Sequence, residues 1–161
     1  MSDLRALLAR PAALRMLLSA LIARLPEAMV PLGLLLLVRE EHGSYGTAGA
    51  MAGAFAVGAA IGGPVAGRLV DRLGQPAVLI ITAVLRSAAL LGIVLSAGSS
   101  LVVAAILAAA CGALTPPLEP ALRALWPDLA GDDEHALAAA YELDAGAQEM
   151  IFVAGPLLVA V

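Results

Sequence analysis

Residues 87–118 read SAALLGIVLSAGSSLVVAAILAAACGALTPPL and contain no charged side chain. A second uncharged stretch runs from Gly43 to Gly67. A transmembrane helix needs about 20 consecutive apolar residues to cross a hydrocarbon layer of about 30 Å. The stretch at 87–118 is too long for one crossing, and the segment SAGSS at 96–100 interrupts it. It therefore predicts two membrane helices joined by a short turn.

The composition of the whole chain also indicates a membrane protein. Hydrophobic residues make up 61% of the 161 residues and charged residues 14%, whereas about 25% of an ordinary soluble domain is charged. A small soluble domain has too much surface to cover with so few charges. The single cysteine, the net charge of −4 and the 3% of aromatic residues exclude a disulfide scaffold and a nucleic-acid-binding protein. We expect an integral membrane protein whose partner is the lipid bilayer, with no nucleic-acid partner.

The same criteria, applied along the chain, predict an all-α integral membrane fold with about five transmembrane helices. The short segments between the spans are typical of a compact helical bundle. The spans are expected at about 13–38, 46–70, 76–97, 101–124 and 137–161. The last apolar run reaches Val161 without a polar flank, so we expect residues 1–161 to be a bundle that is truncated in its fifth helix.

Arginine supplies all the basic side chains, because the chain contains no lysine. Most arginines near the span ends fall on one side of the predicted bundle: Arg5, Arg10, Arg15, Arg68, Arg72 and Arg123. Arg39 belongs to the opposite side. The positive-inside rule therefore predicts a multi-pass protein with a cytoplasmic N-terminus.

The turn between the second and third spans carries the most informative motif, GRLVDRLG at 67–74. Gly67 has no side chain, which suits close helix contact, and Gly74 permits a tight reversal of the chain. Asp71 lies at the C-terminal end of its own helix, where the helix dipole disfavours a carboxylate. We therefore expect Asp71 to need a cation or the N-terminus of another helix as its partner.

The spacing Gly-x-x-x-Asp-Arg-x-Gly at this place resembles the signature loop of the major facilitator superfamily (MFS). Gly67, Asp71, Arg72 and Gly74 match that loop position by position, whereas Gln75-Pro76 replaces its closing basic residues. The resemblance implies that these four residues form a conformational latch. In this family the acidic residue holds the N-terminal half against a helix of the C-terminal half in the outward-facing state.

Other segments are similar to bacterial drug-efflux members of the family. They are Leu25-Pro26 with Met29, Pro116-Pro117, RALW at 123–126, AAYE at 139–142 and Gly155-Pro156. One departure is Ala108, four residues before Gly112, where proton-coupled antiporters of the family carry an arginine. The further glycines of the antiporters' Gly-Pro motif are also missing.

The resemblance implies a secondary transporter rather than an enzyme. Such a protein moves a small solute by alternating access, and we expect efflux through a bacterial plasma membrane, with protons as a candidate coupling ion and no cofactor. The chain corresponds to five of the family's usual twelve helices. The expected partner is therefore a missing C-terminal half.

Ionisable side chains inside apolar spans are costly, since translocon scales give about 2.5–3.5 kcal/mol for a central arginine or aspartate. The deepest candidates are Arg24, Glu27, Arg86 and Glu149. We expect them to face a central aqueous path for substrate or protons. The alternative is a structural role in ion pairs, and the spacing of Arg24 and Glu27 favours a pair on one helix face.

Three further charges lie nearer the predicted inner interface. Glu119 and Arg123 are one helical turn apart in the favourable order, and Glu142 lies near the start of the fifth span. We expect these three residues to form an inner charge network. Asp144 points to a different face of its helix from Glu142 and Glu149.

Two alternatives remain open at this stage. The chain could be a truncated, transport-inactive fragment, or it could be a small membrane interaction protein that oligomerises through the glycines of its second span. Those glycines repeat at the spacing that allows close helix contact: Gly49/Gly53, Gly58/Gly62 and Gly63/Gly67. No nucleophile–base set, phosphate loop or metal-ligand spacing is visible, so we predict neither a catalytic nor a metal site.

Overall fold

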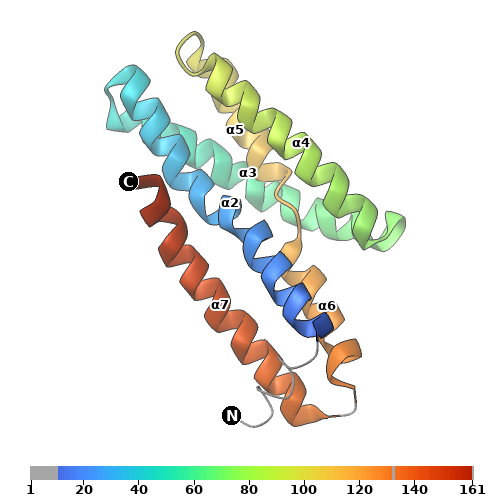
Figure 1. Ribbon diagram of the computed structural model, residues 1–161. Coiled ribbons are helices and arrows are strands. Elements are labelled where there is room, and N and C mark those ends of the chain that lie inside the picture. Colours follow the sequence, from blue (N-terminus) through green and yellow to red (C-terminus); the bar gives the residue numbers. More distant parts are fainter. Residues whose placement is uncertain (1–10, 132, 161) are drawn as a thin grey trace. The chain divides into compact units, whose positions relative to one another are not determined.

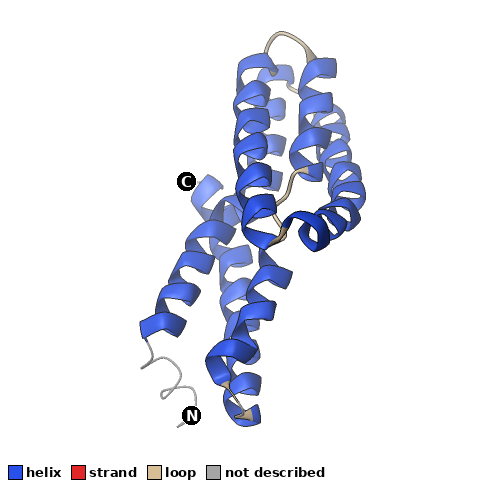
Figure 2. Ribbon diagram, turned by 90° about the vertical axis from the view of Figure 1, so that its right-hand side faces the viewer, coloured by secondary structure: helices blue, strands red, loops and turns tan. Residues whose placement is uncertain are grey.

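The computed structural model describes residues 11–131 and 133–160, and every regular element among them is a helix (Figures 1 and 2). Arg5, Arg10 and Val161 lie outside the described residues. The helices are α2 (Pro11–His42), α3 (Tyr45–Leu73), α4 (Gln75–Ser96), α5 (Leu101–Ala113), α6 (Leu118–Ala130) and α7 (Glu134–Ala160). Five spans within the described part are long and apolar enough to cross a membrane, when α5 and α6 are taken together. This confirms the all-α membrane fold.

Small polar residues and glycine define several of the helix ends. Ser44 begins α3 by accepting a hydrogen bond from the Gly46 amide at 3.2 Å, and Ser100 begins α5 by accepting one from the Val103 amide at 3.4 Å. Such caps satisfy amides that have no partner inside the helix. The SAGSS segment thus forms the expected turn between α4 and α5.

The fourth predicted span is not one continuous helix. The sequence predicts helix over 101–124, but α5 ends at Ala113 and α6 begins at Leu118. Pro116 and Pro117 explain the break, because proline has no amide hydrogen to donate and restricts the residue before it. The helical segment also continues beyond the predicted end, to Ala130.

The described chain divides into two compact units. Unit 1 contains the residues up to Met29 together with those from Leu118 onward, and unit 2 is Val30–Pro117. The chain passes from one unit to the other at two proline-containing places, inside α2 between Pro26 and Pro31 and directly after Pro116-Pro117.

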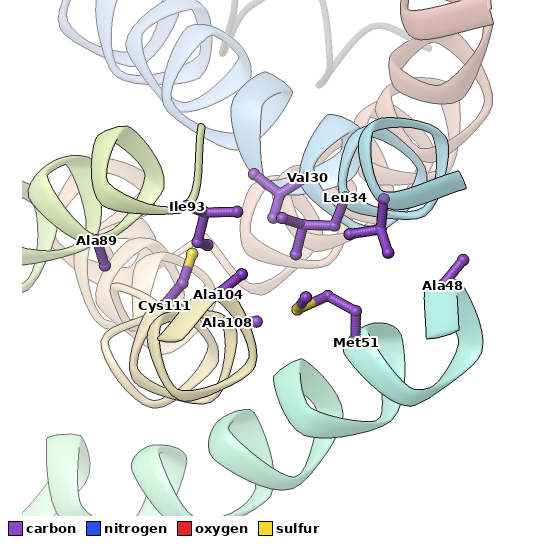
Figure 3. Close-up of a cluster of buried hydrophobic side chains, with 10 residues drawn as sticks. Val30, Leu34, Ala48, Met51, Ala89, Ile93, Ala104, Ala108 and Cys111 are labelled. Carbon is purple, nitrogen blue, oxygen red and sulfur yellow. The ribbon is translucent and has the colours of Figure 1, made fainter. Parts of the chain in front are cut away.

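In unit 2, α3 and α5 approach each other at glycine. A Cβ added to Gly58 would overlap the backbone of Ala109, one added to Gly62 would overlap that of Ala113, and one added to Gly112 would overlap the backbone of α3. Around this contact lies a core of small and aliphatic side chains (Figure 3). Its members are Val30, Leu34, Val38, Ala48, Met51, Ala89, Ile93, Ala104, Ala108 and Cys111.

Unit 1 has a smaller interior. Trp126 of α6 packs with Ala13 of α2 and Ala140 of α7, and Gly155 of α7 lies against Ala28 of α2, where an added Cβ would come within 2.7 Å of the alanine Cβ. Large apolar side chains point outward from both units. Examples are Ile22, Val57, Ile61, Ile80, Val94, Val102, Met150 and Val153. Such an apolar exterior suits a surface that faces lipid rather than water.

Candidate functional site

An ion pair lies in the interior of unit 1. The Arg24 guanidinium of α2 donates from Nη1 to Asp144 Oδ1 at 2.7 Å and from Nη2 to Oδ2 at 3.3 Å. Both side chains are almost fully buried, 5% and 4% exposed. A bidentate geometry of this kind satisfies several donors and acceptors at once and makes the pair strong. The arrangement ties α2 to α7 within the spans.

This pair gives Arg24 a partner that the sequence analysis did not assign. The spacing along α2 favours Glu27 as a partner of Arg24 on the same helix, and the structure adds a carboxylate from another helix. Asp144 was not among the predicted site residues. The signal that could have found it is its position one turn after Ala140 and two turns after Ala136, because the three residues form one buried stripe of α7.

Glu149 occupies a different environment from Asp144. Its side chain is exposed and forms no ion pair or hydrogen bond with the described residues. It lies about 16 Å from the C-terminal end of α7 at 1.5 Å per residue, well inside the apolar helix. A carboxylate at that depth requires water or a partner from another element.

Arg86 lies in the interior of unit 2, on the buried stripe of α4 that also contains Thr82 and Ala89. The residue is only 6% exposed, and its Nη2 atom has no hydrogen-bond partner among the described residues. The guanidinium carbon lies 5.9 Å from the centre of the Phe55 ring of α3. The structure therefore contains a buried cation with an aromatic neighbour and an unsatisfied donor.

The predicted latch motif lies at the junction of α3 and α4. Asp71 and Arg72 are exposed in the last turn of α3, and Asp71 forms no ion pair or hydrogen bond within the described chain. Gly74 ends α3 and begins α4 with φ 82°, a conformation that favours glycine. A Cβ at Gly67 would meet nothing within 4 Å in the described chain, so the expected close helix contact is made by Gly58 and Gly62 instead.

Of the three residues expected to form an inner charge network, two form an ion pair with each other. Arg123 Nη2 lies 2.8 Å from Glu119 Oε1, one turn apart on α6, with both side chains well exposed. Glu142 is exposed on α7 and forms no ion pair with either residue in the described part of the chain. An exposed pair of this kind contributes little to stability.

These features define a class: a polytopic helical membrane protein that holds ionisable side chains inside its spans. A family model described as Major Facilitator Superfamily matches residues 16–160. The chain belongs to the major facilitator superfamily, and it is therefore a lipid-embedded transport protein for small molecules. No curated protein and no solved structure matches it.

Proposed function

We propose that the chain works as a secondary active transporter that exports a small solute by alternating access. In this proposal Arg24, Glu27, Arg86 and Glu149 line the translocation path, and protons drive the export. The observation that carries the proposal is Arg86, a buried cation in mid-span with an unsatisfied donor. An intramembrane charge of this kind marks a functional site more often than a structural one.

We test transport with the purified full chain in proteoliposomes, with a panel of small solutes and with or without a pH gradient. Flux above that of protein-free liposomes is expected, and it should rise when the gradient is imposed. Absence of flux in both conditions would contradict transport by this chain and would fit the transport-inactive alternative. A flux that is equal with and without the pH gradient would contradict proton coupling.

We further propose that Gly67, Asp71, Arg72 and Gly74 form a cytoplasmic latch against another helical bundle. Asp71 supports this role because it is exposed at the unfavourable end of α3 without a described partner. A cation or a helix N-terminus of the other bundle would neutralise it when the two bundles close.

Replacing Asp71 with asparagine is expected to slow export about tenfold, because it removes one charge-assisted hydrogen bond of the closed state. Membrane insertion should not change, since the exposed side chain makes no contact on which the fold of unit 2 depends. Initial rates in proteoliposomes and the inserted fraction measure the two effects. Glu40→Gln, an exposed acid at the end of α2, is the control, and equal rates for both variants would exclude the latch.

A second candidate function, that of a membrane interaction protein that oligomerises, is supported by one face of α3. A Cβ added to Gly49, Gly53, Gly63 or Gly67 would meet nothing within 4 Å in the described chain, so this face is free to approach another helix closely. As an interaction protein, the chain should form an oligomer of defined mass in mild detergent, and Gly53→Leu should dissociate it. A monodisperse monomer in light scattering would contradict this function.

A further inference from the structure

The Arg86 guanidinium is not neutralised by unit 2. Its Nη2 atom has no described hydrogen-bond partner. The nearby hydroxyl of Thr82 donates to the Val78 carbonyl oxygen at 2.7 Å within the same helix. The Phe55 ring, at 5.9 Å, offers a weak cation–π contact but no acceptor for an N–H group. The cation thus keeps an unused donor in an apolar environment.

No acidic side chain of unit 2 is placed to pair with Arg86. The acids of this unit are Glu40, Glu41 and Asp71, and all three are exposed at helix ends. Arg86 lies in the middle of α4, about 15 Å from either end at 1.5 Å per residue. An ion removed from water without a partner has a desolvation cost of several kcal/mol. An anion from outside unit 2 would relieve that cost.

The surroundings of Arg86 indicate which anion fits. A guanidinium presents parallel donors that match the two oxygens of a carboxylate. The guanidinium carbon faces the Phe55 ring, and this ring suits an apolar body attached to the charged group. A lipid headgroup stays near the membrane surface, whereas Arg86 is at mid-depth in its helix.

We propose that Arg86 binds the carboxylate of a small organic anion, with Phe55 beside the apolar part of the ligand. The inference rests on the proposed transport function and names its substrate class, an organic carboxylate. Binding itself requires no transport, so the two can be tested separately.

The binding test uses the full chain in phosphatidylcholine nanodiscs, heated and then analysed by size-exclusion chromatography. Benzoate is the probe, and benzamide is the neutral control of the same shape. Saturating benzoate is expected to raise the unfolding midpoint by about 5 °C, the shift that tight saturation of one site gives in a chain of this size. Benzamide should shift it by less than a quarter as much. Equal shifts for the two probes would overturn the proposal.

Three variants assign the effect to Arg86. Arg86→Met should abolish the benzoate shift and Arg86→Lys should keep a reduced one, because lysine retains the charge but not the paired donors. Arg68→Gln, which removes an exposed arginine of the same unit, should keep the full shift. A benzoate shift that survives in Arg86→Met would overturn the assignment.

Stability without any probe separates a ligand site from a structural ion pair. Arg86→Met should raise the midpoint of the unliganded chain, because it removes an uncompensated buried charge. A lower midpoint, or a variant that cannot be purified folded, would mean that another part of the protein neutralises Arg86, and it would overturn the proposal. Nanodiscs with phosphatidylglycerol form the last arm, since stabilisation by this lipid alone would assign the anion to a headgroup.

Failure of the inference and failure of the proposed function give different results. Benzoate stabilisation that depends on Arg86, together with no solute flux, would keep the carboxylate site and contradict the transporter. Solute flux without any benzoate stabilisation would keep the transporter and contradict this site.

Discussion

Replacing Asp144 with alanine is expected to destabilise the protein by about 3–5 kcal/mol, the usual effect of removing one partner of a buried ion pair. The change leaves the Arg24 guanidinium without the two hydrogen bonds that it makes to the carboxylate, in a site where the arginine side chain is 5% exposed. Unfolding titrations in detergent micelles measure the expected decrease in the free energy of unfolding.

Two controls separate burial from charge pairing in this experiment. Glu119→Ala breaks the exposed pair with Arg123 on α6 and should cost at most about 1 kcal/mol. The double variant Arg24→Met/Asp144→Leu replaces both charges with apolar side chains and should recover most of the stability that Asp144→Ala loses. A loss in Asp144→Ala no larger than that in Glu119→Ala would contradict the buried pair.

Replacing Gly62 with alanine is expected to have the second large effect, a loss of at least about 3 kcal/mol, at the upper end of what overpacking costs. The added methyl group would overlap the backbone of Ala113. Backbone cannot rotate away as a side chain can, so α3 and α5 would have to separate. The same unfolding titration measures the loss.

Gly63→Ala is the matched control, since the two glycines are adjacent in α3. A Cβ at Gly63 meets nothing within 4 Å in the described chain, and alanine favours helix over glycine by up to about 1 kcal/mol. This variant should be neutral or slightly more stable. If both alanine variants behaved alike, the close contact between α3 and α5 would be excluded.

The helices could be predicted from the sequence with little error, because each one satisfies a local rule. Long uncharged runs predict the spans, and the serines at 44 and 100 lie where the caps form. The fourth predicted span lies within one apolar segment, Leu101–Ala130, which the structure divides into α5 and α6 at Pro116-Pro117. Membrane helices often tolerate proline, so the sequence does not show whether a given proline bends a helix or divides it.

The candidate site was predicted less completely. Depth along a helix selected Arg24, Arg86 and Glu149 alike, and the structure buries the two arginines but leaves Glu149 exposed. Depth could not show that Asp144 pairs with Arg24, because that contact joins residues 120 positions apart in the chain. It also could not show which glycines of α3 face α5. The repeated spacing is the same for Gly58/Gly62 and Gly63/Gly67, and within residues 11–131 and 133–160 only the first pair contacts another helix.

The amino-acid sequence by itself therefore determined that this protein is a set of apolar membrane helices, because hydrocarbon imposes length and composition on each span separately. Only the tertiary structure decided which buried charges are neutralised: Asp144 pairs with Arg24, and Arg86 keeps a donor without a partner in the part of the chain that the structure describes. The physical reason is that the free-energy cost of burying a charged side chain depends on the group that pairs with it. That group comes from another helix, at a distance along the chain that no local pattern encodes.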